Sequence, residues 1–334
     1  MLTSREIHGS FILISPMSSN NNPQIAFLFP GQGSQKLGMG HELASTCPAA
    51  RHVFEQADEW LRYPLSRLAW DGPESELNDT INTQPALLVH SVAVLFVFQD
   101  LFPSIKPAFV AGHSMGELSA LVAAGCLPYK DALFLARRRG ELMKQAGQLN
   151  PGGMAAILGL DLLTVERICR ETSTPDDIVQ LANDNCPGQV VISGAAPALD
   201  RAIELAQKAG ARRTKKLAVS IPAHSPLMAH AQSDFNLAVE DAPITDPVFP
   251  IIGNVTASPL STASQIRSDL QAQLNSPVLW TESVKFMIAH GVSKFYELGS
   301  GSVLTGLLKR IDHGVVGVPL GASDDFDKLT SQYT

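Results

Sequence analysis

The sequence is poor in cysteine and in charge. It has 4 cysteines, and only 17% of its 334 residues are charged. Cys47, Cys126, Cys169 and Cys186 form no Cys-x-x-Cys pair and no cluster with histidine, so neither a zinc site nor a disulfide framework is indicated. We therefore expect reduced thiols in a cytoplasmic protein without a metal site.

Two further absences limit the classes of partner. No run of apolar residues reaches the roughly 18 that a membrane-spanning helix needs, and the sequence has no internal repeat or low-complexity segment. The 25 basic residues against 32 acidic ones give a net charge of -7. A net acid attracts neither phosphate backbones nor acidic lipid headgroups, so we expect no nucleic-acid partner and no membrane partner. A net negative charge is compatible with local basic patches.

The first 22 residues differ in composition from the rest of the chain. Their apolar patch, Phe11 to Ile14, is too short for the core of a signal peptide, and a polar Ser/Asn tract follows it. We expect residues 1–22 to be a disordered extension, with Met17 as an alternative start of the chain. An organellar targeting segment is the other alternative, and the single arginine at position 5 disfavours it.

Hydrophobic residues make up 45% of the chain, enough for a large core, and strand-like and helix-like segments alternate along it. This order predicts an α/β fold with a largely parallel sheet. We expect the body to span residues 23–150 and 220–322, with a C-terminal tail at 323–334. Its predicted strands are 25–29, 107–111, 248–253 and 294–298, and its predicted helices are 82–96, 117–124, 131–146, 226–239 and 264–275.

Residues 151–219 follow a different pattern, which predicts a small inserted subdomain. The segments alternate as strand, helix, strand, strand, helix and strand, a βαββαβ order. A Pro/Gly-rich stretch at 150–153 is typical of a hinge or linker before it. The predicted strands are 154–158, 178–182, 189–193 and 213–219, and the predicted helices are 162–171 and 198–209.

The most informative motif is Gly112-His113-Ser114-Met115-Gly116. An apolar segment precedes it, and a run of good helix formers follows. A strand, a tight Gly-x-Ser-x-Gly turn and a helix expose a serine at the carboxyl edge of a parallel sheet and direct the first N–H groups of the helix toward it. The motif predicts that Ser114 is the nucleophile of an acyl transfer. The alternative is a turn of small residues that lets strand and helix pack closely.

A serine nucleophile needs a base, and His224 is our candidate. It lies on a loop between Pro222 and Pro226, just before a predicted helix, where tertiary structure can hold an imidazole against a distant hydroxyl. On position alone, a solvated loop histidine is the alternative. His90 lies in an apolar helix and is expected in the core.

Arg139 lies on the apolar face of the predicted helix 131–146, whereas Arg137 and Arg138 point elsewhere. A guanidinium does not lose its charge on burial, so it needs an anion. A protein carboxylate and a ligand carboxylate are equally good candidates at this stage. A ligand carboxylate near an acylating serine would select an acyl group that carries its own free carboxylate.

Seven segments resemble the malonyl-CoA:acyl carrier protein transacylase family, and they occur in family order from about residue 24 to 320, nearly the whole chain. They are FLFPGQGSQ at 27–35, GHSMGE at 112–117, RRRG at 137–140, NDNCPGQVVISG at 183–194, VSIPAH at 219–224, QLNSPVLW at 273–280 and YELGSGSVL at 296–304. The resemblance implies an α/β-hydrolase-like body with a parallel sheet and an inserted ferredoxin-like subdomain.

The resemblance also implies the activity and the site. Ser114 would take a malonyl group from coenzyme A as an ester, and His224 would act as base and then acid in a Ser–His dyad. Arg139 would hold the malonyl carboxylate. The remaining implied residues are Gln32 and Met115, whose N–H groups would form the oxyanion hole, Gln273, which would orient the histidine, and His113, Asn185 and Gln84, which would line the pocket.

The implied partners are acyl carrier protein and a coenzyme A thioester, both as substrates, with no cofactor. Acyl carrier proteins are acidic, and the resemblance places carrier-protein and coenzyme A contacts near Arg212 and Arg213, beside Lys215 and Lys216. By charge alone, a solvated strand end is equally good as an explanation of these residues. We expect a monomer.

Departures from the family pattern are few. Met115 stands where leucine is usual, which matters little because its N–H is the group used. The residues flanking His224 lie where acyl preference varies, so another extender unit such as methylmalonyl is an alternative. A malonate decarboxylase subunit, a serine esterase and a non-catalytic scaffold are the others, and fatty-acid and polyketide synthesis are not separated by sequence.

Overall fold

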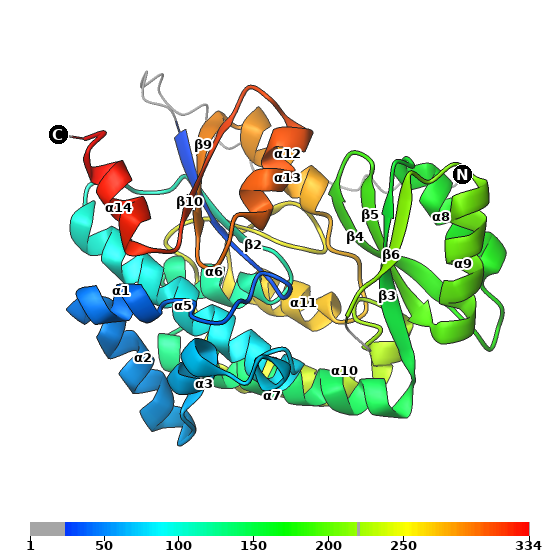
Figure 1. The fold of residues 1–334 in the computed structure, drawn as a ribbon, viewed down its shortest axis with the longest axis horizontal. Coiled ribbons are helices and arrows are strands. Elements are labelled where there is room, and N and C mark those ends of the chain that lie inside the picture. Colours follow the sequence, from blue (N-terminus) through cyan, green and yellow to red (C-terminus); the bar gives the residue numbers. More distant parts are fainter. Residues whose placement is uncertain (1–23, 219–220, 334) are drawn as a thin grey trace, which may run out of the picture.

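The computed structural model describes residues 24–218 and 221–333 (Figure 1). The extension expected at 1–22 lies outside these residues, as does Val219. Two sheets lie side by side, and the larger has six strands. In spatial order these are β10 (Val316–Leu320), β9 (Val292–Leu298), β1 (Gln24–Phe29), β2 (Phe109–Gly112), β7 (Ile251–Ile252) and β8 (Pro259–Leu260).

The pairs from β10 to β7 are all parallel, and only β8 pairs in the antiparallel sense. This confirms the predicted α/β fold with a largely parallel sheet. Because side chains alternate along a strand, Phe27 and Phe29 of β1 join one apolar cluster while Ala26 and Leu28 join another. The sheet is therefore covered on both faces, as parallel sheets require.

Helix α5 (Thr80–Leu101) is the central helix of the body, and it packs on α2 (Pro48–Leu61) and α7 (Tyr129–Leu149). It is long and apolar enough to cross a membrane, but 83% of its apolar 18-residue stretch is buried inside the protein. This is the environment of a core helix. It begins earlier than predicted, because Asp79 caps it by accepting a hydrogen bond from the N–H of Ile81. His90 lies in it and is 1% exposed, as expected.

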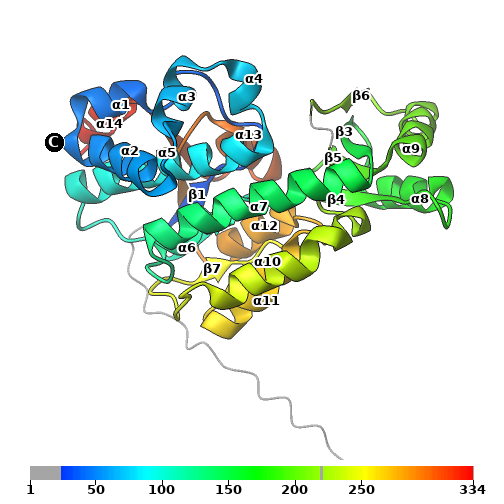
Figure 2. The ribbon, with the colours of Figure 1, turned by 90° about the horizontal axis from the view of Figure 1, so that it is seen from below.

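The smaller sheet is antiparallel and lies at one end of the molecule (Figures 1 and 2). The predicted βαββαβ order is present, and the two helices share an apolar cluster with the strands. The strands in spatial order are β4 (Val179–Cys186), β5 (Gln189–Ala195), β3 (Gly152–Leu158) and β6 (Arg213–Lys216), and the helices are α8 (Leu162–Thr172) and α9 (Ala196–Lys208).

The stretch 150–153, predicted to be a linker, is partly a strand. Gly152 and Gly153 belong to β3 and pair with Ala195 and Gly194. A Cβ at Gly152 would lie 2.4 Å from the carbonyl oxygen of Gly194, so glycine serves close strand pairing here rather than a hinge.

Three other predictions need correction. The strand expected at 248–253 is only Ile251–Ile252, because Pro250 lacks an N–H and the N–H of Val248 bonds to the carbonyl of Ala124. The helix expected at 226–239 begins as a 3-10 turn, η1 (Pro226–Met228), and continues as α10 (Ala229–Asp241). The expected tail at 323–334 contains α14 (Ser323–Thr330), which buries Phe326 and Leu329.

Several elements had no counterpart in the sequence predictions. Figure 2 shows α10 packed between the long helix α7 and α11. The unpredicted helices are α1 (His41–Thr46), α3 (Leu65–Asp71), α4 (Glu74–Leu77), α12 (Trp280–Ala289), α13 (Val303–Ile311), α14 and α2, whereas α6 (Gly116–Ala123) and α11 (Ala263–Gln273) lie close to their predicted bounds.

Candidate active site

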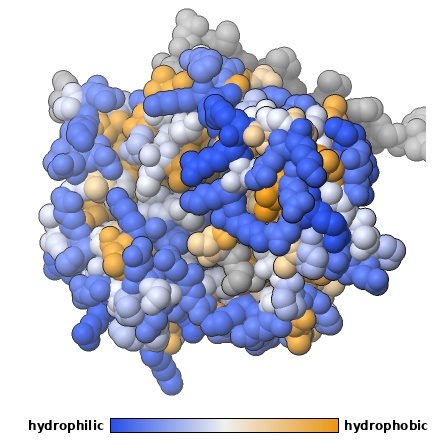
Figure 3. All heavy atoms as spheres, turned by 45° about the vertical axis from the view of Figure 1, so that its right-hand side comes forward, coloured by the Kyte–Doolittle hydropathy of each residue, from blue (hydrophilic) through white to orange (hydrophobic). Residues whose placement is uncertain are grey.

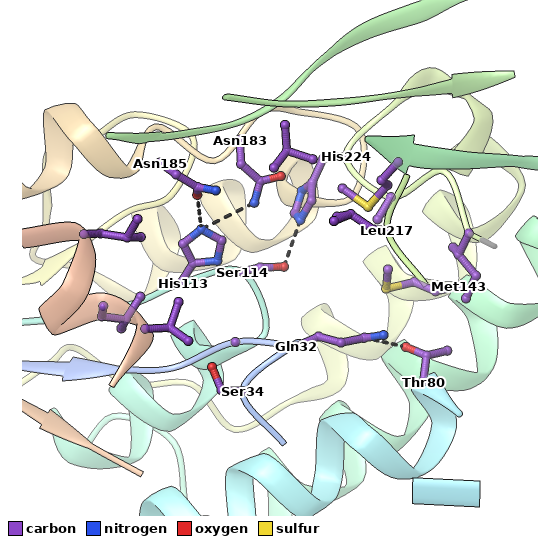
Figure 4. Close-up of a pocket in the computed structure, with 18 of the residues that line it drawn as sticks. Gln32, Ser34, Thr80, His113, Ser114, Met143, Asn183, Asn185, Leu217 and His224 are labelled. Atoms are coloured by element: carbon purple, nitrogen blue, oxygen red, sulfur yellow. Dashed lines mark hydrogen bonds between the residues drawn. The ribbon is translucent and has the colours of Figure 1, made fainter. Parts of the chain in front are cut away.

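Ser114 lies in a sharp turn between β2 and α6, as the motif predicts (Figure 4). Its φ is 52°, in the left-handed region that residues other than glycine rarely adopt. The flanking glycines allow the turn: a Cβ at Gly112 would lie 2.0 Å from the carbonyl carbon of Gly116, and one at Gly116 would lie 2.3 Å from the carbonyl oxygen of Phe29. The motif is therefore a strained elbow that presents the serine, and not only a close strand–helix contact.

His224 is brought to Ser114 from 110 residues along the chain, with 2.8 Å between Nε2 and Oγ. Its Nδ1 lies 2.9 Å from the carbonyl oxygen of Gln273 and 3.1 Å from that of Ser276. Carbonyl oxygens only accept, so Nδ1 carries the proton and Nε2 is left to accept from the serine hydroxyl. His224 is 3% exposed, which is not the solvated alternative.

Burial and the positive charge of Arg139 lower the pKa of His224 to about 3. The imidazole is consequently neutral at physiological pH and ready to accept a proton. Gln273, predicted to orient the histidine, contacts His224 through its main-chain carbonyl and not through its side chain. Its side chain is engaged elsewhere, since Oε1 accepts from Arg139 at 2.8 Å and Nε2 donates to Glu117.

Arg139 is 1% exposed and lies beside the serine, with 3.1 Å between its Nη2 and Ser114 Oγ. Nη1 donates to Gln84 Oε1 at 2.9 Å, and Nη2 donates to Gln273 Oε1. Within residues 24–218 and 221–333 no carboxylate lies within ion-pair distance of this guanidinium, and its Nε has no partner. Burial lowers its pKa to about 10, so it stays charged. The structure therefore favours the ligand-carboxylate explanation over the buried ion pair.

The two residues predicted to form the oxyanion hole, Gln32 and Met115, lie in the segments that follow β1 and β2. Gln32 follows β1, lines the same cavity, and accepts from Thr80 Oγ1 at 2.8 Å through its side chain (Figure 4). Met115 precedes α6 and is 1% exposed. Among the described residues, neither main-chain N–H donates a hydrogen bond, so both are free for a ligand oxygen.

His113 lines the same cavity as Arg139. Its Nε2 is 2.8 Å from Asn185 Oδ1 and 3.3 Å from Asn183 Nδ2, and burial lowers its pKa. Both asparagines come from β4 of the smaller sheet (Figure 4).

The cavity itself measures about 170 Å³ and lies between the two sheets. Met154, Val191 and Leu217 reach it from the smaller sheet and its flanks, while Leu307 reaches it from α13. Polar and apolar side chains line the cavity in about equal numbers.

Arg212 and Arg213 are exposed at the start of β6, beside the exposed Lys215 and Lys216. Leu217, directly after this strand, lines the cavity. With a rise of about 3.3 Å per residue, the basic strand leads from the surface to the cavity within roughly 15 Å. The face that carries the smaller sheet is largely hydrophilic (Figure 3).

Sequence reasoning missed four residues of the site, namely Thr80, Glu117, Asn183 and Asn254. Asn254 Oδ1 accepts from the N–H of Ser114 at 2.8 Å, and its Nδ2 donates to the carbonyl of Gly112. Glu117 was visible as the last residue of the elbow motif, but nothing in the sequence marked Asn254. Within the described part of the chain, no group of three or more His, Cys, Asp or Glu side chains could hold a metal ion.

A serine on a strand–helix elbow, a histidine in the base tautomer and a buried, unpaired guanidinium together define a serine-dependent acyltransferase. A family model for the acyl transferase domain matches residues 26–315. A curated malonyl CoA-acyl carrier protein transacylase from Bacillus subtilis is 47% identical over 289 residues, which is 86% of this chain and 90% of the relative.

Two solved structures agree with this. A malonyl-CoA:acyl carrier protein transacylase from Xanthomonas oryzae pv. oryzae matches with a TM-score of 0.89 at 41% identity, covering 93% of this chain and 98% of that one. A malonyl transacylase solved in complex with a type II polyketide synthase acyl carrier protein matches with a TM-score of 0.89 at 41% identity, covering 92% and 99%. The chain belongs to the malonyl-CoA:acyl carrier protein transacylase family.

Proposed function

We propose that this protein transfers a malonyl group from coenzyme A to the phosphopantetheine thiol of acyl carrier protein, through an ester on Ser114. The observation that carries the proposal is Arg139, a charged guanidinium buried 3.1 Å from the nucleophile with no carboxylate of the described chain paired to it. A bound malonyl carboxylate supplies the missing anion, and the planar guanidinium suits a carboxylate.

In the first half-reaction Ser114 Oγ attacks the thioester carbon while His224 Nε2 takes its proton. The free N–H groups of Gln32 and Met115 receive the oxyanion, and losing one such donor typically costs about a hundredfold to a thousandfold in rate. The proton then passes from His224 to the departing thiolate, and coenzyme A leaves.

Substrate binding also changes the pKa of the base, His224. The charge of Arg139 helps to depress the pKa of His224 in the free protein. A malonyl carboxylate bound to Arg139 offsets that charge and raises the pKa of His224 toward a value better suited to a general base. An acyl group without a carboxylate leaves the base weak, so selectivity acts on the chemical step as well as on binding.

In the second half-reaction the carrier thiol enters the same cavity, His224 takes its proton, and the thiolate attacks the malonyl-serine ester. Breakdown of the tetrahedral intermediate returns the proton to Ser114 and completes a ping-pong cycle. Arg212 and Arg213 lie at the surface end of β6 and suit an acidic carrier protein. Gln84 holds Arg139 in place through a hydrogen bond. His113 and Asn185, which contact each other, line the same cavity as the serine.

The finer architecture is part of the same proposal. The strand order β4-β5-β3-β6 with two helices supports a ferredoxin-like subdomain at 151–219, inserted into an α/β-hydrolase-like body at 23–150 and 220–322. We also propose that the protein acts in the cytoplasm as a monomer, needs no cofactor, and binds neither nucleic acid nor membrane. Pathway and extender unit beyond a carboxylated acyl group are left to experiment.

Intact-mass measurement after incubation with malonyl-, methylmalonyl- or acetyl-CoA tests the proposal. We expect a malonyl adduct that is absent in Ser114→Ala and disappears when acyl carrier protein is added. Equal acetyl and malonyl labelling would contradict the role of Arg139. Release of free malonate without transfer would instead indicate an esterase, and activity that survives Ser114→Ala would exclude the nucleophile.

A further inference from the structure

Glu117 is a fully buried acid behind the nucleophile that the proposed mechanism does not use. It lies in the first turn of α6. One of its oxygens, Oε2, accepts two hydrogen bonds, from Gln273 Nε2 at 2.5 Å and from Asn254 Nδ2 at 2.6 Å. This one oxygen therefore accepts from the NH₂ groups of both amides.

Each of these amides uses its other end in the site. Gln273 Oε1 accepts from Arg139 Nη2 at 2.8 Å, and Asn254 Oδ1 accepts from the N–H of Ser114 at 2.8 Å. An amide presents an oxygen at one end and an NH₂ at the other, so an acceptor that binds the NH₂ determines where the oxygen points. Glu117 thereby sets the orientation of the group that holds Arg139 and of the group that holds the elbow.

The second oxygen of Glu117 is in a different situation. Among the described residues no donor reaches Oε1, although the atom is buried. A second acid, Asp269, is 3% exposed and shares a neighbour with Glu117: Asn254 donates its Nδ2 to Glu117 and its main-chain N–H to Asp269. Two neighbouring buried carboxylates cannot both be charged at a reasonable free-energy cost.

The surroundings decide which of the two acids holds the proton. Asp269 accepts from the main-chain N–H groups of Asn254 at 3.1 Å and Val255 at 3.4 Å, donors that favour its charged form. Glu117 has no such donors beyond the two amides, and Arg139 is separated from it by Gln273. Burial and the charge of Asp269 raise the pKa of Glu117 well above its usual range.

We propose that Glu117 is a positioning residue that acts as an uncharged carboxyl: Oε2 aligns the amides of Gln273 and Asn254, and Oε1 donates its proton to the carboxylate of Asp269. The part that concerns acyl selectivity rests on the proposed function, because it acts through Arg139. The part that concerns the proton does not depend on Arg139: it rests on the burial of both acids, on their shared contact with Asn254 and on the unpartnered Oε1.

The substitution Glu117→Gln separates this proposal from a charged Glu117. A glutamine reproduces every bond of a protonated glutamate, since its oxygen accepts from both amides and its NH₂ donates to Asp269. We expect Glu117→Gln to keep the malonyl-to-acetyl labelling ratio within about threefold of the unmodified protein. Glu117→Ala should lower that ratio about tenfold, because Gln273 is then free to turn its NH₂ toward Arg139.

Either of two results would overturn the proposal. A Glu117→Gln protein that loses malonyl selectivity as severely as Glu117→Ala would show that a negative charge is required. A Glu117→Ala protein with an unchanged ratio would show that the amides need no such acceptor.

The charge state has a readout that needs no activity. In protein labelled with ¹³C-glutamate, the infrared difference between unmodified protein and Glu117→Gln should contain the carbonyl band of a protonated carboxyl at neutral pH. A carboxylate band in its place would refute the uncharged state, even if Glu117→Ala does not fold. If the unmodified protein formed no malonyl adduct, the proposed function would fail while this measurement still decided the protonation of Glu117.

Discussion

Arg139 is a charged side chain that the fold buries beside a nucleophile and leaves without a counter-charge among the described residues. Its neighbours, Gln84 and Gln273, are amides that fix the guanidinium without neutralising it. A guanidinium kept in this state is prepared for an anion that arrives with the substrate.

Replacing this guanidinium should change which acyl group is accepted. We expect Arg139→Ala to lower the malonyl-to-acetyl labelling ratio by about a hundredfold or more, because a carboxylate loses two charge-assisted hydrogen bonds of about 1.5–3 kcal/mol each. Arg137 is a matched control on the same helix, since it is partly exposed and pairs with Glu141, and Arg137→Ala should leave the ratio unchanged. Intact-mass labelling with both thioesters measures the ratio, and an unchanged ratio in Arg139→Ala would place the carboxylate elsewhere.

His90 gives a stability prediction that is independent of catalysis. Burial lowers its pKa from 6.5 to about 4, while Nε2 contacts the carbonyl of Gly321 at 2.9 Å. The unfolded chain therefore takes up the proton first as the pH falls, so the contribution of His90 to stability is present above 6.5 and is lost as the pH falls toward 4.

Titration of His90 should change the free energy of unfolding by about 1.4 kcal/mol per pH unit within this window. In His90→Gln, which keeps a donor for Gly321, the free energy of unfolding should depend on pH less steeply by about that amount over the same window. Urea unfolding at a series of pH values measures the slope. Parallel slopes in the two proteins would mean that His90 is protonated in the folded state.

The sequence predicted these site residues unevenly, for a physical reason. Ser114 and Arg139 were found because a turn motif and a helical period are local patterns. Asn254 was not found, because its role depends on the approach of β7 and α6, more than 130 residues apart in sequence, and an asparagine after a short strand carries no local signal. The orienting role of Gln273 was assigned to the correct residue, but it is its carbonyl that contacts His224.

At the scale of the element, the turn between β2 and α6 is the feature most dependent on residue size. A Cβ at Gly112 would lie 2.0 Å from main-chain atoms of Gly116, a contact that the backbone must move to relieve. We expect Gly112→Ala to abolish labelling of Ser114 and to destabilise the protein by several kcal/mol, on the order of other backbone clashes.

Gly306 in α13 is the matched control for this change. An added Cβ there meets nothing within 4 Å, and alanine is favoured over glycine in a helix by roughly 0.5–1 kcal/mol. Gly306→Ala should therefore label normally and melt at the same temperature or slightly higher. Thermal unfolding and intact mass report both outcomes, and normal labelling of Gly112→Ala would contradict the packing argument.

Strand β4 contributes a contact that links the smaller sheet to the base. Gln180 Nε2 donates to the carbonyl of His224 at 2.8 Å and to that of Asn275 at 3.2 Å. His224 has a φ of 58°, so its backbone is strained and needs such support. The position of the imidazole thus depends on how the smaller sheet sits on the body.

We expect Gln180→Ala to slow malonyl loading about tenfold without changing the malonyl-to-acetyl ratio, since Arg139 is untouched. Gln180→Glu should be slower still, because a carboxylate would face two carbonyl oxygens. Gln207→Ala is the control, because the side chain of Gln207 donates to Thr214 Oγ1 within the same sheet and helix pair and reaches neither His224 nor Asn275 among the described residues. Rapid-quench loading rates would test this, and a normal rate in Gln180→Glu would show that the contact is dispensable.

For the whole molecule, the α/β class and the βαββαβ unit could be predicted, because they depend on the alternation of apolar segments. The helices α1, α3 and α4 could not, because they have only 6, 7 and 4 residues and their N-cap residues, Gly40, Pro64 and Pro73, make no side-chain capping hydrogen bond. Short helices of this kind owe their formation to packing on the core, which no single segment reveals.

Charge distribution gives the last prediction at this scale. The protein is a net acid, so an acidic carrier protein must be attracted by a local patch, and Arg212 and Arg213 lie exposed at the start of the strand that leads to the cavity. We expect Arg212→Glu/Arg213→Glu to raise the KM for acyl carrier protein by about tenfold to a hundredfold. That KM should also depend less on salt concentration than in the unmodified protein. Malonyl loading from coenzyme A should change less, because the thioester carries far fewer negative charges than a whole carrier protein.

Arg167 in α8 provides a charge-reversal control outside the basic strand. It is exposed and pairs with Glu171 on the same helix, and it belongs to the same small sheet and helix pair as the basic strand. Arg167→Glu should leave the KM for acyl carrier protein within about twofold, because screening over about 8–10 Å confines the effect of a surface charge to its surroundings. Steady-state transfer assays at several salt concentrations separate the two sites. An equal loss in both variants would show that net charge, and not the patch at the cavity entrance, governs the encounter.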